Sequence, residues 1–451
     1  MSDIIAAIAT GRAPCAISIL RLSGPGCAAL TGRVFTPKQP FADAPDRRLV
    51  LGLLHDRQGR VIDECLGVVC RAPHSYTGEE TVELQCHGSP AMLAAGLEAL
   101  LAAGARQAGP GEFTRRAFLN GKLDLTQAEA VIDLIDAETA DAAANAAGQL
   151  GGALKRAIGP VYDGLTDLCS HFHAVLDYPD EDIEDFGAAE LSGALDRAGA
   201  ALQELLATYE KGRHLRQGVR AVLLGKPNAG KSSLLNRLAG YDRVIVTDIA
   251  GTTRDTVEEP VRVGRVLLRL TDTAGIREAG DAIEALGVAR SEQAAREAEL
   301  ALFVCDASQP LTDEDRRAIE AAKCAPRSLA LCNKSDLPAA VSPDELPFDT
   351  VLTVSARTGA GLDALPALLE GWFLGENACD GSLLTNPRQF GALDRASRAI
   401  ERAKTGLCLG VTPDAVLTDV EEAMAALGEV TGRTVREDIT NRIFERFCVG
   451  K

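Results

Sequence analysis

The sequence predicts a multidomain fold that combines α/β parts with an all-α part. Short apolar runs broken by Gly and Pro predict an N-terminal α/β domain over residues 1–118. Helical periodicity takes over at 119–216 and returns at 377–451. Between these two stretches, residues 217–376 alternate short apolar strands with helices, which is typical of a mainly parallel sheet. We therefore expect an α/β domain inserted into a helical domain whose two parts pack together.

The composition is that of a globular protein with sizeable cores. The 451 residues are 46% hydrophobic and 25% charged, which fits roughly two to four domains. Aromatic residues make up only 4%, and Ala-rich stretches recur, so we expect helices packed through small side chains. The twelve cysteines are scattered without a C-x-x-C spacing, which favours reduced thiols in a cytoplasm over disulfides or a zinc site.

Charge and hydropathy argue against several classes of protein, namely secreted, membrane-spanning and broadly nucleic-acid-binding proteins. The first ten residues lack a basic segment and a long apolar run, so we expect no signal peptide. No stretch approaches the ~18 apolar residues of a membrane span. The formal net charge of −17 argues against broad electrostatic adhesion to nucleic acid, so an RNA substrate would need a local basic patch or a partner protein.

The N-terminal half contains three clear strand signals and one helix start. Residues 15–24, 65–72 and 81–89 have strand-like apolar runs. Thr126 and Glu129 form a capping-box pattern for the helix that follows. Its apolar face is predicted to carry Ala128, Val131, Ile132 and Ile135.

Two features of the first helical stretch resemble metal sites. The acidic run 177–186 is more simply a solvated loop. His171 and His173 do not share a helix face well, so we interpret them as structural or incidental.

The inserted domain begins with a phosphate-binding loop. Residues 225–233 read "GKPNAGKSS" and match G-x-x-x-x-G-K-[ST] between a strand and a helix. Backbone N–H groups of such a loop cradle phosphates. Lys231 is expected to act in catalysis at the β- and γ-phosphates, and Ser232 to bind Mg²⁺. The residues assigned to nucleotide binding here are Asn228, Ala229, Gly230, Lys231, Ser232 and Ser233.

Further motifs follow in a fixed order and predict guanine nucleotide binding. In "DTAG", Asp272 is predicted to hold Mg²⁺ through water and Gly275 to contact the γ-phosphate. In "NKSD", the Asp336 carboxylate accepts the two adjacent N–H donors of guanine, which adenine lacks. The residues assigned from these two motifs are Asp272, Thr273, Ala274, Gly275, Asn333, Lys334, Ser335 and Asp336.

Two more segments complete the predicted site. "SAR" offers backbone N–H groups for the guanine oxygen through Ser355, Ala356 and Arg357. "TDIAGTTRD" provides Thr253 as the switch residue that faces Mg²⁺. The assigned residues of the second segment are Thr247, Asp248, Ile249, Ala250, Gly251, Thr252 and Thr253. Four motifs in this order predict that the chain binds GTP.

One position departs from Ras-like GTPases. The residue after "DTAG" is Ile276, where those proteins use Gln to orient the attacking water. Another polar group must therefore order the water, and a positive charge is needed at the phosphates. Nearby polar candidates are Arg277, Glu278, Asp281 and Glu284.

Taken together, the motifs resemble one known family along essentially the whole chain. They are "LRLSG", "TGEETVELQCHGSP", "PGEFTRRAFLNGKLDLTQAEA", "GKPNAGKSSLLN", "TDIAGTTRD", "DTAGIRE" and the terminal "FCVGK". The chain is identified on these residues as a member of the MnmE (TrmE) family of tRNA-modifying GTPases.

The resemblance implies a function for each part. Residues 1–118 would bind a tetrahydrofolate and dimerise, 119–216 and 377–451 would form the helical domain, and 217–376 the G domain. The family works as a homodimer, in a heterotetramer with the flavoprotein MnmG, whose FAD is not held by this chain. It acts on tRNA in the cytoplasm and adds an aminomethyl or carboxymethylaminomethyl group to carbon 5 of the wobble uridine. The one-carbon unit is taken from a folate, as the 5-formyl or 5,10-methylene form.

The resemblance also implies how GTP is hydrolysed. The family binds K⁺ beside GTP, and the matching positions are Asn228, Thr247, Ile249 and Thr252. Glu284 matches the family's water-orienting glutamate, which would resolve the Ile276 departure. Without the resemblance, Glu284 is a surface acid like any other.

The family's folate contacts match Arg21, Glu83, Lys122 and Lys451. A carboxylate such as Glu83 suits the amino-pyrimidinone donors of a pterin, and basic side chains suit folate carboxylates. Taken singly, each of these residues is a solvated charge, and only the motif match assigns it.

The terminal "FCVGK" raises a separate question about Cys448. Lys is not a usual last residue of a prenylation signal, so that explanation fails. Ile439, Ile443 and Phe447 have helical spacing and are expected to dock the tail. Cys448 is then a thiolate that attacks carbon 6 of uridine, or a small buried hydrophobe that packs the tail.

Two other functions compete with a tRNA-modifying GTPase. A regulatory or ribosome-assembly GTPase would explain the G domain but not the N-terminal motifs or the tail. A folate-binding aminomethyltransferase-like protein with a vestigial G domain conflicts with the intact nucleotide motifs.

Overall fold

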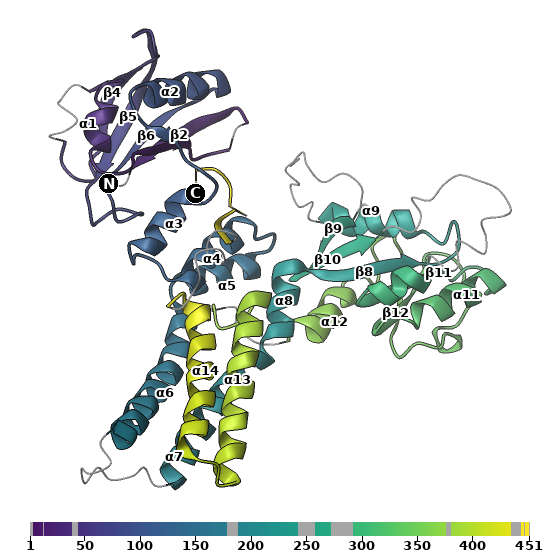
Figure 1. Ribbon diagram of the computed structural model, residues 1–451. Helices are drawn as coiled ribbons and strands as arrows, with labels where there is room; N and C mark the ends of the chain where they lie inside the picture. Colours follow the sequence, from purple (N-terminus) through teal and green to yellow (C-terminus); the bar gives the residue numbers. More distant parts are fainter. Residues whose placement is uncertain are drawn as a thin grey trace. The chain divides into compact units, whose positions relative to one another are not determined.

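The computed structural model describes residues 3–11, 13–37, 44–177, 188–241, 258–271, 292–375, 380–433, 443–445 and 447–450 (Figure 1). The chain forms two compact units. Unit 1 comprises residues 1–132, 158–185 and 405–451, and unit 2 comprises 133–157 and 186–404. The predicted boundaries at 118, 216 and 376 stay predictions.

Unit 1 begins with a seven-stranded sheet in the order β3-β4-β5-β6-β2-β1-β7. Its neighbours are antiparallel except for the parallel pair β1 and β7. The strands are β1 (Ile5–Ile8), β2 (Cys15–Ser23), β3 (Phe35–Pro37), β4 (Val50–His55), β5 (Val61–Cys70), β6 (Thr81–Gly88) and β7 (Arg106–Gln107). The three predicted strand signals are confirmed as β2, β5 and β6.

One core of unit 1 is shared by this sheet and two helices, α1 (Cys27–Thr31) and α2 (Pro90–Ala102). Alternating side chains of the strands, such as Leu20 and Leu54, are fully buried in it. The helix α2 approaches the sheet closely at Gly96, where a Cβ atom would lie 2.9 Å from Leu20 Cδ1.

The helices α3 (Glu112–Leu119) and α4 (Leu125–Ile135) follow the sheet. The predicted capping box at Thr126 and Glu129 is wrong, because the helix starts earlier. Asp124 Oδ1 accepts a hydrogen bond from Gln127 N at 2.9 Å, and Asp124 N donates to Gln127 Oε1 at 3.1 Å. These reciprocal bonds satisfy backbone groups that a helix start leaves without partners. Ile135 is 47% exposed, so it also leaves the predicted buried face.

The C-terminal tail packs on α4. Phe444 and Phe447 are buried with Ala128, and Ile443 lies against the same cluster. The predicted docking of the tail is confirmed for Ile443 and Phe447, whereas Ile439 lies outside the described residues.

The remaining helices are α5 (Ala140–Leu150), α6 (Ala153–Asp177), α7 (Ala188–Ala207), α8 (Tyr209–Gln217), α13 (Pro387–Cys408) and α14 (Pro413–Thr431). Most of these helices are Ala-rich, as the composition indicated, although α8 contains no Ala. In unit 1, α6 packs on α14, where Cys169 Sγ lies 3.4 Å from Met424 Sδ. In unit 2, α7 packs on α13, where Gln203 Nε2 donates to Ser397 Oγ at 2.9 Å. Helical residues from both sides of the inserted domain therefore meet, as predicted.

The inserted domain contains a six-stranded sheet in the order β13-β12-β11-β8-β10-β9. The strands are β8 (Val219–Leu224), β9 (Glu258–Val263), β10 (Val266–Thr271), β11 (Leu300–Asp306), β12 (Arg327–Asn333) and β13 (Val351–Thr353). All neighbours are parallel except β9 and β10, so the predicted mainly parallel sheet is confirmed. The antiparallel edge strand β9 was not predicted.

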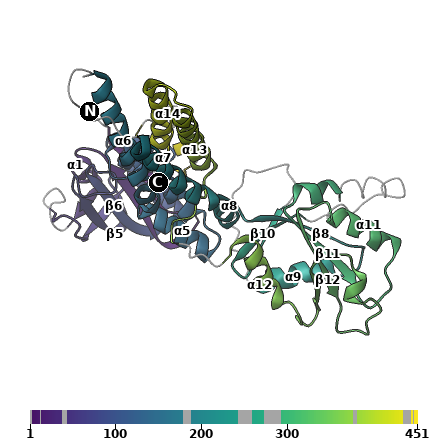
Figure 2. The same ribbon diagram turned by 90° about the horizontal axis from the view of Figure 1, so that it is seen from below.

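Helices cover both faces of this sheet (Figure 2). One core contains Leu234 of α9 (Lys231–Tyr241) and Leu369 of α12 (Ala364–Phe373). The other contains Ile319 of α11 (Asp313–Ala322). A short 3-10 helix, η3 (Pro343–Glu345), precedes β13. This two-sided burial explains the nearly continuous apolar runs of the central strands.

Candidate functional site

The phosphate-loop motif forms a turn between β8 and α9. Gly225 has φ 144°, and a Cβ atom there would lie 2.1 Å from Val304 O. Gly230 has φ 95°, and its Cβ atom would lie 2.2 Å from Asn333 Nδ2. Only glycine fits either position, because both combine a left-handed backbone with a close neighbour. Asn228 adopts φ 63°, a conformation that Asn tolerates better than most residues.

Lys231 is the first residue of α9, and its side chain bends back over the loop. The ammonium donates to Gly225 O and, at 2.9 Å, to Lys226 O. These carbonyls hold the cation above the turn, where the phosphates of a nucleotide are expected. Ser232 and Ser233 follow in the first turn and are exposed.

A buried ion pair anchors the loop from below. Lys226 Nζ lies 2.9 Å from Asp315 Oδ2, and the Asp315 side chain is fully buried. The same carboxylate oxygen caps α11 by accepting from Thr312 N at 2.9 Å. This anchor was not predicted from the sequence, although the Thr312–Asp315 capping-box spacing was a signal for it.

Asn333 joins the phosphate loop to the guanine-reading segments. Its Nδ2 donates to Ala229 O at 2.9 Å, and its Oδ1 accepts from Ala356 N at 2.9 Å. The residue is 2% exposed, so the role of this Asn is to hold two loops together. Lys334, with φ 65°, places its ammonium 2.6 Å from Asp306 Oδ2.

Asp336 is held in position by its neighbours. Its Oδ1 accepts from Ser355 Oγ at 2.6 Å, and Arg357 NH1 lies 3.7 Å from its Oδ2. The Ser355 hydrogen bond lowers the pKa of this carboxyl group below its usual value. Asp336 is therefore an anionic acceptor at neutral pH, as bidentate recognition of guanine requires.

The predicted role of the "SAR" backbone needs a correction. Ser355 N donates to Ala360 O at 2.9 Å, and Ala356 N donates to Asn333 Oδ1. The Ser355 N–H is thus directed into its own loop. A guanine oxygen would have to share the Ala356 N–H with Asn333 or take that of Arg357.

Several predicted site residues lie outside the described residues. They are Thr247, Asp248, Ile249, Ala250, Gly251, Thr252, Thr253, Asp272, Thr273, Ala274, Gly275, Glu284 and Lys451. The structure therefore describes the phosphate loop and the guanine segments of the predicted nucleotide site.

A second group of predicted residues meets on the N-terminal sheet. Arg21 of β2 and Glu83 of β6 are paired in the strand register, and Arg21 Nε donates to Glu83 Oε1 at 2.8 Å. The guanidinium carbon lies 5.8 Å from the Tyr76 ring centroid and 5.7 Å from that of Phe113. Aromatic faces attract a guanidinium at such distances. Neither ring was predicted from the sequence: Phe113 lies in the quoted "PGEFTRRAFLNGKLDLTQAEA" without an assigned role, and Tyr76 lies outside the quoted motifs.

The C-terminal tail reaches this group. Arg21 NH1 donates to Gly450 O at 3.4 Å, and Val449 forms an antiparallel bridge with Pro110. Gly450 has φ 104°, and a Cβ atom there would lie 2.3 Å from Ile8 O. The last residues are thus held against the N-terminal sheet of the same unit.

The other two predicted residues of this region differ in their surroundings. Lys122 Nζ donates to Pro73 O at 3.2 Å, so it reaches the loop that also carries Tyr76. Cys448 is exposed, and its carbonyl accepts from Gly111 N at 3.3 Å. The hypothesis of a buried Cys448 is therefore wrong, because the backbone of this residue packs while its side chain faces outward.

A cavity of about 470 Å³ lies in unit 2, away from the nucleotide motifs. Two of its lining pairs are ionic: Arg216 Nε lies 2.8 Å from Asp133 Oδ1, and Arg269 contacts Glu138. Arg269 belongs to β10 and Glu138 precedes α5, so this pair joins the sheet to a helical segment, whereas Arg216 of α8 pairs with Asp133 of α4. Neither pair was predicted from the sequence.

Among the helices of the described residues, none is long and apolar enough to cross a membrane.

Comparison with known proteins covers the whole chain. A family model described as the MnmE helical domain matches residues 125–448, and one described as the GTP-binding protein TrmE N-terminus matches residues 4–122. A tRNA modification GTPase MnmE of Roseiflexus sp. (strain RS-1) is 45% identical over 465 residues, covering 100% of this chain and 99% of the relative. Proteins of the same name from Chloroflexus aurantiacus and Aquifex aeolicus are 43% and 41% identical, and each covers 100% of both chains.

Proposed function

Because this chain belongs to the MnmE family of tRNA modification GTPases, we propose that it uses GTP hydrolysis to drive modification of the wobble uridine. The coarser function, a GTPase that acts in tRNA modification, follows from the family. Identity of 45% over the full length supports it, together with nucleotide loops held together by Asn333.

The proposed product carries a new group at carbon 5 of that uridine. This chain works with a flavin-dependent partner, MnmG, which holds the FAD, and the reaction takes place on tRNA in the cytoplasm. A folate in the 5-formyl or 5,10-methylene form supplies the one-carbon unit. The product is the aminomethyl or carboxymethylaminomethyl derivative.

The nucleotide residues divide the work on GTP. Lys231 contacts the β- and γ-phosphates, and Mg²⁺ is held by Ser232 and Thr253, with Asp272 acting through water. Asp336 accepts the two guanine N–H donors, which its lowered pKa supports. Bound Mg²⁺ neutralises charge on the phosphates, while the loop holds their orientation.

Hydrolysis is proposed to depend on potassium. Asn228 supplies a side-chain oxygen at the phosphate loop, and Thr247, Ile249 and Thr252 complete the set. The ion offsets the negative charge that develops during transfer, as an arginine finger does elsewhere. Glu284 orients the attacking water, in the role that Ile276 cannot take.

The folate is proposed to bind where Arg21, Glu83 and the tail meet. The Arg21–Glu83 contact of 2.8 Å places a carboxylate acceptor beside a cation, and the ring of Tyr76, which is 40% exposed, offers an apolar face for a pterin. Glu83 would accept the pterin N–H donors. Lys122 and Lys451 would hold the glutamate carboxylates.

Cys448 is kept as a candidate nucleophile, which its exposure supports. Its thiolate would add to carbon 6 of uridine, which would make carbon 5 nucleophilic toward the one-carbon donor. Replacement of Cys448 by Ser tests the thiol separately from the tail backbone.

An exposed apolar face supports the proposed homodimer. Four large apolar side chains are exposed here. On and beside β4 they are Leu49 (50% exposed), Leu51 (37%) and Leu53 (37%), and on the neighbouring β5 it is Val61 (55%). Their buried neighbours alternate with them, so this is the sheet face opposite the α2 core. Exposed apolar patches mark interaction sites, and a second copy would cover this one. The domain assignment of 1–118 to folate binding and dimerisation rests on the same proposal.

The decisive experiment measures wobble-uridine modification by mass spectrometry in a strain that lacks the gene. The intact chain is expected to restore the modified base. Unmodified uridine with active GTP hydrolysis would favour a regulatory or ribosome-assembly GTPase instead.

Asp336→Asn tests the nucleotide assignment in the same strain. An amide at this position offers a donor, so affinity for GTP should fall and xanthosine triphosphate should bind better. Asp349→Asn makes the same chemical change at an exposed residue outside the nucleotide motifs and is the matched control. If GTP remains the preferred ligand of Asp336→Asn by a wide margin, Asp336 does not read guanine.

A further inference from the structure

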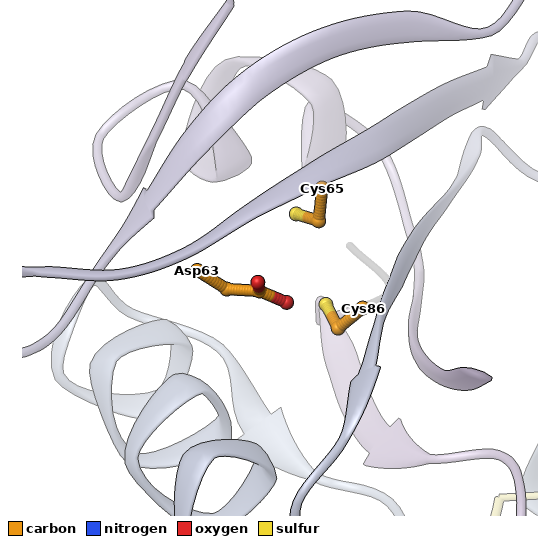
Figure 3. A group of neighbouring side chains, drawn as sticks. All are labelled: Asp63, Cys65 and Cys86. Atoms are coloured by element: carbon orange, nitrogen blue, oxygen red, sulfur yellow. The ribbon is translucent and has the colours of Figure 1, made fainter. Parts of the chain in front are cut away.

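Three metal-ligating side chains converge on one face of the N-terminal sheet. Asp63 and Cys65 are two residues apart on β5, so their side chains share a face. The register pairs Leu66 of β5 with Gln85 of β6, so Cys86 is the next residue opposite Cys65. One ligand atom of each side chain lies within 4.8 Å of the others, and Figure 3 shows the carboxylate directed toward the two sulfur atoms.

All three groups are withdrawn from water. Cys65 and Cys86 are 3% and 2% exposed, and the Asp63 side chain is 8% exposed. Contact with the Cys65 thiol and burial raise the pKa of Cys86 above its usual range. Without a bound cation, this thiol therefore stays protonated.

The carboxylate is held in place by His87. The ring Nδ1 of His87 lies 2.7 Å from Asp63 Oδ1, and His87 N donates to Asp63 Oδ2 at 2.9 Å. Hydrogen bonds that orient a carboxylate in this way are typical of the outer shell of a metal site.

We propose that Asp63, Cys65 and Cys86 form a binding site for a divalent metal ion of the zinc class. Two sulfur ligands and one carboxylate suit Zn²⁺, which binds four ligands tetrahedrally. Tetrahedral coordination at a Zn–S distance of ~2.3 Å brings two sulfur atoms to about 3.8 Å, and the ligand atoms here already lie within 4.8 Å of one another. Water completes the coordination, and His87 positions Asp63.

Binding of the metal ion is coupled to the release of protons from the two thiols. Each thiol loses one proton as its sulfur binds the metal. The binding constant should therefore fall on acidification. The scattered cysteine spacing predicted no zinc site, because the pairing of β5 and β6 is not visible in it.

The chain offers a matched control. Cys305 and Cys332 are also neighbours on paired strands, β11 and β12, with their Sγ atoms 4.0 Å apart. Both are 1% exposed. Within the described ranges, the three-ligand grouping occurs at Asp63, Cys65 and Cys86 and not at this pair. The control pair therefore has buried thiols without the third ligand.

The test uses the full-length chain, reduced and freed of metal by a chelator. We expect one Zn²⁺ per chain by elemental analysis after dialysis, and a thiolate-to-cobalt charge-transfer band on titration with Co²⁺. Cys65→Ser with Cys86→Ser should abolish both signals, whereas Cys305→Ser with Cys332→Ser should keep them. His87→Ala should weaken Co²⁺ binding about 10- to 100-fold and keep the thiolate band.

The intact chain alone can overturn the proposal, whatever the folding of the variants. Absence of the thiolate band and of bound zinc would show that the cysteines are only small apolar residues of the core. A band that survives in Cys65→Ser with Cys86→Ser, checked for folding by circular dichroism, would place the metal elsewhere.

Discussion

The nucleotide loops and the proposed folate residues are assembled in different ways. The nucleotide loops follow β8, β12 and β13, which are parallel strands of one sheet, and each loop carries its own contiguous motif. Arg21, Glu83, Phe113 and Gly450 come from two antiparallel strands, a helix and the end of the chain. All four residues lie in motifs that carry the family resemblance, but none of these motifs by itself indicates a ligand.

The difference shows where sequence motifs suffice. Carboxyl ends of parallel strands meet at one edge of a sheet, so motif order alone places the nucleotide loops together. No such rule places the residues of an antiparallel sheet and of the C-terminal tail that packs on it. The proposed folate site therefore depends on strand register and on long-range packing. Variants that disturb one assembly should therefore leave the other intact.

The largest expected effect comes from Gly230→Ala in the phosphate loop. The added Cβ atom would meet Asn333 Nδ2 at 2.2 Å, on a backbone with φ 95°. Displacement of the loop should lower kcat/KM for GTP by about 100-fold or more, because reacting groups lose their alignment. Folate binding, measured by calorimetry, should not change.

Gly371→Ala is the control, since no heavy atom lies within 4 Å of a Cβ atom at that helical position. Near-normal GTP hydrolysis by Gly230→Ala would show that Asn333 moves aside and that the loop is not rigidly held.

The next largest effect is expected on the potassium dependence of GTP hydrolysis, for which Asn228 is the proposed ligand. Hydrolysis by the intact chain should be faster in K⁺ than in Na⁺ on the order of 10- to 100-fold, because the ion offsets developing charge. Asn228→Gly removes the side-chain oxygen while accepting φ 63°, so the difference between the salts should disappear while GTP still binds.

Asn228→Asp keeps an oxygen ligand and should retain part of the K⁺ effect. Equal rates of the intact chain in both salts would exclude a potassium site at this loop.

A smaller effect is expected from Gly450→Ala in the tail. Its Cβ atom would lie 2.3 Å from Ile8 O, with φ 104°, so the tail and its contact with Arg21 should be displaced. Folate affinity should fall about 10-fold, the equivalent of one lost hydrogen bond to a charged group. GTP hydrolysis should stay normal.

Gly104→Ala has an equally strained φ of 119° but no heavy atom closer than 3.7 Å to a Cβ atom, so it controls for backbone strain alone. Unchanged folate affinity in Gly450→Ala would separate the tail from the folate site.

The last prediction concerns stability alone and tests an anchor that no motif contains. Burial would raise the pKa of Glu299, but hydrogen bonds from His214 and Arg213 outweigh it and lower the pKa to about 2. The stabilisation is present above the ordinary pKa of 4.5 and is lost as pH falls toward 2. Glu299→Gln should lower the free energy of unfolding at pH 7 by up to about 3 kcal/mol, with the difference fading below pH ~4.

Glu320→Gln removes an exposed partner of Lys323 and should cost about 0.5 kcal/mol or less. Urea unfolding at several pH values measures both variants. A pH-independent loss in Glu299→Gln would mean that its packing, and not its charge, stabilises the domain.

Sequence alone determined the parts of this protein that short segments encode. Strand alternation predicted β2, β5 and β6, and the motif order predicted the phosphate and guanine loops. Helical spacing also predicted that the apolar residues Ile443 and Phe447 dock the tail. These features depend on backbone conformation and side-chain spacing over a few residues. Both can be inferred from the local sequence.

Tertiary structure decided what depends on residues far apart in the chain. Tyr76 and Phe113 join Arg21 only after the sheet and α3 are packed, and Cys65 meets Cys86 only through strand register. Cys448 points outward because its carbonyl bonds to Gly111 N while the flanking Phe447 is buried. Even the cap of α4 is Asp124 and not the predicted Thr126, since Asp124 Oδ1 accepts from Gln127 N in the folded chain. These features depend on contacts between distant segments, which form together only in the folded chain. No single segment of the sequence contains that information.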